Sequence, residues 1–208
     1  MRSTVNLFNT ALARLGGEQL SSLTSPLEES TLGQLCKNLF PHVLDMSLQT
    51  TTWGFALRTV VLPLVAGKHT EGSKYVFCYK VPADCVRPVE IETPHISNRS
   101  PAYIIQGDVE GSLLLCNESP AALVYVSRVT DSRQWPPSFA DALAWGLAAE
   151  LSTARNNDPQ RQQFYMQMYR SALAEAAVRD RREINPHPPR SAWNDARFGD
   201  DIDCGGER

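Results

Sequence analysis

The sequence lacks the clustered ligands that a structural metal site needs. Its four histidines are scattered, and its five cysteines include no C-x-x-C pair. Cys78 and Cys85 lie seven residues apart, but no second pair follows to complete a tetrahedral site. We therefore expect no bound metal. We expect reduced cysteines, since a chain of 208 residues can build its core without disulfides, and a Cys78–Cys85 bridge across a hairpin is the less favoured alternative.

The motifs of common enzymes and nucleotide-binding proteins are also missing. The chain contains no G-x-S-x-G, no G-x-x-x-x-G-K-[ST] and no G-x-G-x-x-G. Glu90 and Glu92 alternate on one face of an expected strand, which is more typical of a solvated face than of an acid–base pair. A hydrolase with dispersed catalytic residues is thus disfavoured, and we predict a protein that is not an enzyme, with no catalytic residue and no cofactor.

Nor does the chain carry an excess of positive charge or a long apolar run. Its net charge is −3, whereas proteins that bind duplex DNA usually have a strong basic surplus. A single-strand binder could use Tyr75, Phe77 and Tyr79, but of the basic residues only Lys74 and Lys80 are near. No window is long and uncharged enough for a membrane span, and the N-terminus has no secretory pattern. We expect neither specific DNA binding nor membrane attachment.

Two helices are expected in the N-terminal quarter. Residues 4–15 carry apolar side chains at helical spacing, and Gly16 with the glycine after it supplies a stop. The second helix is predicted to begin after a capping serine at Ser25 and to reach about Met46. Pro41 removes a helical hydrogen bond within it, so we expect a kink or a short break there.

Two more helices are expected near the C-terminus. One begins behind Pro136 and Pro137, with Ser138 as its predicted cap. The other begins at Pro159 and ends at about Glu183, because proline is favoured at the first helical position and apolar residues then recur on one face. Asp158 is the predicted cap of this last helix.

Between the helical pairs, the chain is typical of β structure. Six short segments rich in β-branched and aromatic residues are separated by Gly, Pro, Asn and Asp: TVVLPLV, KYVFCYKV, CVRPVEI, AYIIQ, SLLLC and ALVYVSRV. We predict an α+β fold, a helical bundle of residues 1–54 and 136–183 with an antiparallel β domain of residues 55–135 inserted. Asp84 is expected to cap a turn through its own backbone, and Cys85 to begin the next strand as a small buried residue.

Residues 184–208 differ in composition, being rich in proline, glycine and charge. Such a segment cannot bury enough apolar surface to order itself. Its two aromatics, Trp193 and Phe198, are plausible anchors on another surface, and a merely disordered end is the alternative. We predict an extended C-terminal arm.

Several stretches, in order, resemble the tail tubular protein A family, the head-to-tail adaptors of short-tailed, podovirus-type bacteriophages. The first is LFNTALARLGGE near the N-terminus, followed by Cys36 in the second helix. TTWGFALR then matches the W-x-F-A signature of the family, and YKVPADCVRPVEI matches its Y-x-x-P-x-D-C-x-R pattern. The resemblance ends with ALVYVSRVTDSRQWPPSFADALAWGLAAELS and AEAAVRDRRE and covers roughly residues 1–183.

The resemblance implies a structural virion protein, a head–tail connector whose copies form a ring, typically twelvefold. This dodecamer would bind the portal protein on one side and the tail nozzle protein on the other, as part of the conduit for DNA ejection. Genomic DNA would pass through without specific binding, as the weakly negative charge favours. The expected location is the tail or neck of the virion, after assembly in the host cytoplasm. Another neck or tail-nozzle structural protein is the alternative.

Two groups of residues are expected to carry this role. We predict that the arm binds the portal, with Trp193 and Phe198 buried and with Arg190 and Arg197 paired to carboxylates. The other group is an inter-domain core that joins the helices to the β domain. Its predicted members are Trp53, Phe55, Tyr79 and Cys85.

Overall fold

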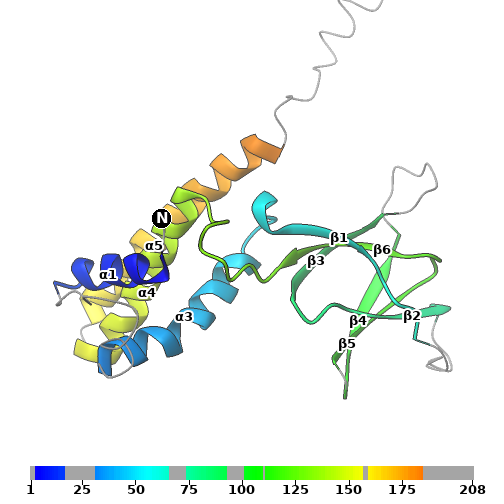
Figure 1. Ribbon diagram of the computed structural model, residues 1–208, viewed down its shortest axis with the longest axis horizontal. Helices are drawn as coiled ribbons and strands as arrows, with labels where there is room; N and C mark the ends of the chain where they lie inside the picture. The colour runs from blue at the N-terminus through cyan, green and yellow to red at the C-terminus, as the bar shows by residue number, and fades with distance from the viewer. Residues whose placement is uncertain are drawn as a thin grey trace, which may run out of the picture.

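The computed structural model describes residues 3–16, 31–65, 74–92, 101–109, 111–156 and 159–184. These residues form an α+β fold with four α-helices and two antiparallel sheets (Figure 1). The helices are α1 (Thr4–Arg14), α3 (Thr31–Gln49), α4 (Pro137–Asn156) and α5 (Pro159–Ile184). Between α3 and α4 lie a short 3₁₀ helix and six strands: η1 (Gly54–Ala56), β1 (Leu57–Val61), β2 (Phe77–Lys80), β3 (Cys85–Glu92), β4 (Tyr103–Asp108), β5 (Gly111–Cys116) and β6 (Ala122–Ser127). The predicted α+β class is confirmed.

The ends of the helices follow local chemistry, with one correction. The Ser3 hydroxyl accepts a hydrogen bond from the Val5 amide at the start of α1, and Gly16 takes a positive φ of 70° just after its end. Ser138 is not the cap of α4, because the helix already begins at Pro137, whose missing N–H costs nothing at the first position. The caps predicted at Ser25 and Asp158 lie outside the described residues.

Helix α3 continues through Pro41, so of the two outcomes predicted there the short break is wrong and the kink stays a prediction. Proline inside a helix costs roughly 3 kcal/mol. Buried side chains on both sides of it, including Cys36 and Leu44, offset this cost by packing into the same core. The burial of the helix on both sides of the proline therefore keeps it in one piece.

The six strands form two three-stranded sheets, ordered β1-β6-β3 and β2-β5-β4. Strand β3 contains register shifts beside Arg87 and Pro88. Such bulges accommodate a proline, which cannot donate a ladder hydrogen bond. After β1 the chain crosses to the second sheet, where the Val65 amide donates to the Cys78 carbonyl at 2.8 Å.

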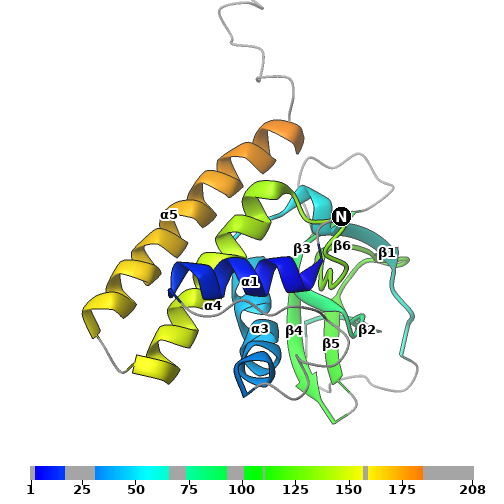
Figure 2. The same ribbon diagram turned by 60° about the vertical axis from the view of Figure 1, so that its left-hand side comes forward.

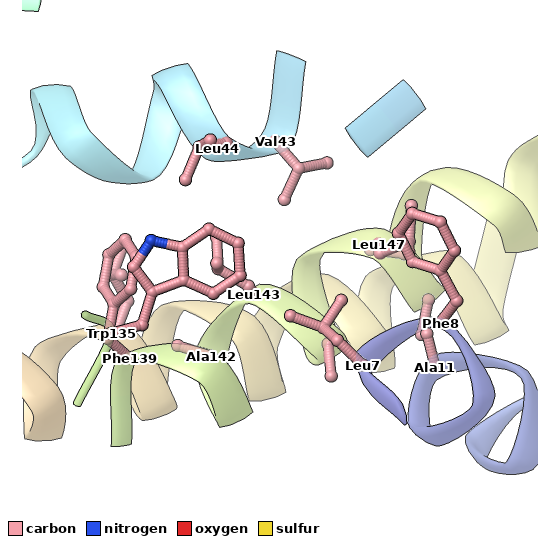
Figure 3. Packing of buried hydrophobic residues seen from close by; sticks show 14 of the residues in the cluster. Leu7, Phe8, Ala11, Val43, Leu44, Trp135, Phe139, Ala142, Leu143 and Leu147 are labelled. Carbon is pink, nitrogen blue, oxygen red and sulfur yellow. The ribbon is translucent and has the colours of Figure 1, made fainter. Parts of the chain in front are cut away.

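The two larger of three apolar clusters among the described residues order these elements into three layers. In the first core, α4 packs against α1, α3 and α5. Figure 3 shows Leu44 of α3 facing Trp135 and Leu143, and Phe8 of α1 beside Leu147 of α4.

The β1-β6-β3 sheet contributes Val126 to this helical core. Tyr125, the residue before Val126, and Leu123 face the opposite side of β6 and belong to the second core, between the two sheets. The β1-β6-β3 sheet is thus the middle layer. Figure 2 shows α5 and α4 side by side at the left, with the strands at the right.

Candidate functional site: the junction between helices and sheets

Trp53 occupies the centre of the link between α3 and β1. Its side chain is fully buried, and its indole Nε1 donates to the Ser47 carbonyl at 2.9 Å. The ring centroid lies 4.8 Å from that of Phe139 in α4, in an edge-to-face arrangement, and Phe55 lies 4.9 Å from the same ring. The three aromatics therefore fasten the end of α3 to the start of α4.

The short helix η1 is held from two sides. Asp180 of α5 is a buried carboxylate whose Oδ2 accepts a hydrogen bond from the Gly54 amide at 2.8 Å. On the other side, the buried Ser127 hydroxyl of β6 donates to the Ala56 carbonyl at 3.0 Å. A carboxylate at the amino end of a helical turn satisfies a backbone donor that has no partner within the turn. These contacts connect α5, the link and the middle sheet.

Arg87 of β3 and Arg128, the residue that follows β6, bind the carboxyl end of α3 and the link after it. The Arg87 guanidinium donates to the Gln49 carbonyl at 3.3 Å and to the Thr52 hydroxyl at 3.0 Å. Arg128 forms a two-point ion pair with Asp45, with an Nε–Oδ1 distance of 2.8 Å. Such planar two-point pairing fixes orientation as well as distance. The sheet is thus held against α3 by directional contacts in addition to apolar packing.

The four residues predicted as an inter-domain core lie in two different places. Trp53 and Phe55 pack with the helical core, whereas Tyr79 and Cys85 belong to the core between the two sheets. The Tyr79 hydroxyl donates to the Glu118 carbonyl at 2.8 Å. The structure therefore brings the four together as two pairs, one on each side of the middle sheet.

Asp84 makes a contact that local sequence did not indicate. Its carboxylate accepts a hydrogen bond from the Tyr125 hydroxyl at 3.1 Å, so the side chain does not cap its own turn as expected. That turn is closed by the Cys85 amide, which donates to the Pro82 carbonyl at 3.1 Å. Burial raises the pKa of Tyr125, and the neighbouring Asp84 carboxylate raises it further.

The four cysteines within the described residues are poorly suited to nucleophilic chemistry. Cys36, Cys78, Cys85 and Cys116 are free thiols, and Cys85 is half-buried while the others are buried. Burial raises the pKa of the Cys36 and Cys85 thiols to about 11, so both are protonated at neutral pH. Within the ranges that the structure describes, no group of His, Cys, Asp or Glu side chains could hold a metal ion.

A hollow of about 170 Å³ lies between the first half of α1 and the start of α4. Its wall includes Asn6, Thr10, Trp135 and Asp141. The Asp141 carboxylate is already paired with Arg14. Small-molecule sites usually measure roughly 300–1,000 Å³. The size of the hollow does not favour a substrate site.

Sequence reasoning missed Asp180, although a signal was present. Asp180 follows the buried Leu173 and Ala176 at intervals of seven and four residues, which places it on the buried face of α5. A lone carboxylate on such a face predicts a specific partner, because an unpaired buried charge is costly. The residues predicted for portal contact, Arg190, Trp193, Arg197 and Phe198, lie outside the described residues.

We expect Asp180→Ala to lower the free energy of unfolding by about 1–3 kcal/mol, because the Gly54 amide loses its acceptor inside the protein. Chemical denaturation of the purified variant measures the change. Glu175→Ala in the same helix is the control; it removes an exposed pair with Arg179 and should change stability by less than about 0.5 kcal/mol. Equal effects of the two substitutions would contradict the role assigned to Asp180.

Comparison with known proteins adds no relative. A scan against protein-family models and a search of curated proteins both found no match for the chain. Among the described helices, none combines the length and the apolar character needed to cross a membrane.

Proposed function

We propose that this protein is a structural component of a short-tailed phage virion, a head-to-tail adaptor whose copies form a ring between the portal and the tail nozzle. In this proposal the helices from both ends of the chain act as a bundle, the β domain is inserted into it, and residues 184–208 are an extended arm. The family in this proposal comes from the resemblance to tail tubular protein A. The contacts that join the helices to the sheets support a structural role.

One observation carries the proposal: the residues that match the family patterns are used to join elements. Trp53 and Phe55 contact Phe139, and Arg87 reaches the end of α3. The thiol in the second pattern, Cys85, has a pKa of about 11 and is therefore a neutral packing residue. Matching residues that serve to hold helices and strands together favour a structural protein over an enzyme.

A ring of identical subunits has clear physical requirements. Each subunit must present two different, mutually complementary patches, because one heterologous interface is repeated around the ring. Each contact to the portal can be weak, since many copies bind together and act at high effective concentration. A net charge of −3 per subunit also suits a conduit, because a strongly basic lumen would hold DNA in place.

The portal-binding part of the proposal is tested by removing the arm. We expect truncation after Glu183 to weaken attachment to purified portal rings at least about tenfold, since it removes both aromatic anchors. Co-sedimentation with portal rings measures attachment, and thermal unfolding checks that the shortened chain is folded. Truncation after Gly199 keeps Trp193 and Phe198 and is the matched control, which should retain attachment. Undiminished binding by the shorter chain would reject the role of the arm.

A further inference from the structure

The two sheets stack so that their outer strands form two opposite rims. On one side, the segment that follows β1 crosses over to β2, where the Lys80 amide donates to the Pro63 carbonyl at 3.1 Å. On the other side, β4 lies beside β3, where the Tyr103 hydroxyl donates to the Val89 carbonyl at 3.4 Å. We call these edges the β1–β2 rim and the β3–β4 rim. Because β6 and β5 are the central strands, the rims face away from each other.

Both rims expose apolar side chains that a further layer of protein could cover. Val60 pairs with Leu123 and Ile105 pairs with Leu114, so both face the space between the sheets. Each is nevertheless 37% exposed, because it lies on an outermost strand. Their neighbours Val61 and Ile104 are 64% and 42% exposed. An outer strand with exposed apolar residues is a ready template for contact with another chain.

The two rims differ in the sign of their charge. Strands β1 and β2 carry exposed Arg58 and Lys80 and no acidic residue. Strand β3 carries exposed Glu90 and Glu92, and its one basic residue, Arg87, is engaged with α3. Among the described residues, the β1–β2 rim is therefore basic and the β3–β4 rim acidic. Like charges disfavour contact between two copies of the same rim, whereas the opposite rims of two copies attract.

We infer that the β1–β2 rim of one copy binds the β3–β4 rim of the next copy. The contact joins apolar strands and opposite charges, and it uses two different surfaces of the same chain. Because these surfaces lie on opposite sides of the subunit, the contact repeats from copy to copy, which is the geometry of a heterologous ring or chain. The inference rests on the proposed function in that it identifies the surfaces that would join the subunits of an adaptor ring.

Charge reversal on each rim tests the inference with the full-length protein. Arg58→Glu/Lys80→Glu makes both rims acidic, and Glu90→Lys/Glu92→Lys makes both rims basic. We expect each variant alone to self-associate at least about tenfold more weakly than the wild type in sedimentation velocity at low salt. An equal mixture of the two should recover association, because acidic and basic copies can alternate. Added salt should weaken the association of the wild type.

A control separates the rims from a general effect of charge. Arg170→Glu/Arg181→Glu makes the same change in net charge as Arg58→Glu/Lys80→Glu, but on exposed positions of α5, and should associate like the wild type. Thermal unfolding confirms that each variant is folded. Rim variants that associate as well as the wild type, a mixture that does not recover, or a wild type that stays monomeric at the highest concentration would each overturn the inference.

Binding to portal rings distinguishes this inference from the proposed function. Subunits that associate through their rims but do not attach to the portal support the rim contact and overturn the adaptor role. Conversely, the wild type could form its own ring on the portal, and the rim variants could form that same ring. This result would overturn the rim contact and leave the adaptor role standing.

Discussion

Replacing Trp53 with alanine is expected to lower the free energy of unfolding by about 3–5 kcal/mol. The substitution removes a fully buried ring that contacts Phe139, and it removes the hydrogen bond to the Ser47 carbonyl. Removal of the ring would leave a cavity between α3, α4 and the link to β1. Neighbouring side chains could fill this cavity only if a helix or the sheet shifted. Denaturant unfolding monitored by circular dichroism measures the loss.

Trp145→Ala is the matched control for this prediction. Trp145 is only partly buried and packs on the outside of the helical core beside Arg14, so its removal leaves no enclosed cavity. We expect it to cost less than half as much as Trp53→Ala. Near-wild-type stability of Trp53→Ala would mean that the indole is not enclosed, and it would reassign Trp53 to an interaction surface.

Gly146→Leu is expected to destabilise the protein by about 3 kcal/mol. A Cβ atom at this position would lie 2.8 Å from Val43 Cγ1 and 3.0 Å from the Tyr169 ring. Neither neighbour can yield easily, because Val43 is β-branched on a helix and the Tyr169 hydroxyl is hydrogen-bonded to Ser47 at 2.8 Å. Helix propensity alone predicts the opposite sign, with a gain of about 1 kcal/mol on replacing glycine by alanine.

Two further variants test whether lack of space is the cause. Gly107→Leu makes the same chemical change where nothing lies within 4 Å of the added Cβ, so we expect a much smaller effect. Val43→Ala removes one of the clashing groups, and in that background Gly146→Ala should be less costly than in the wild type. The contrary result is that Gly146→Ala costs the same free energy of unfolding in the wild type and in the Val43→Ala background. That result would show that the close approach of α3 to α4 is not the cause.

Much of the secondary structure could be predicted because its signals are local. Each predicted strand segment overlaps an observed strand, although the ends differ by one or more residues, since short runs of β-branched and aromatic residues are separated by residues that turn the chain. Helix α5 begins at Pro159, where the sequence places it, because proline and apolar periodicity both point to that start. The Ser138 cap was wrong because two consecutive prolines offer competing starts, and the helix uses Pro137.

Contacts between distant residues could not be predicted in the same way. Spacing indicates that Tyr79 and Trp53 are buried, but the layer in which each lies depends on how the sheets stack, and only the three-dimensional arrangement shows that. The Asp84–Tyr125 and Asp180–Gly54 hydrogen bonds join residues far apart in the sequence. The partner of a buried polar residue depends on which groups lie nearby in the folded protein. A pattern within a window of ten residues therefore carries little information about that partner.

The adaptor role is tested most directly by imaging the purified full-length protein together with isolated portal rings. The account predicts closed rings of this chain, stacked coaxially on one end of the portal, with a subunit count that matches the symmetry of the complex. Protein that stays free of the portal at saturating concentration, or that attaches without forming a ring, would contradict it.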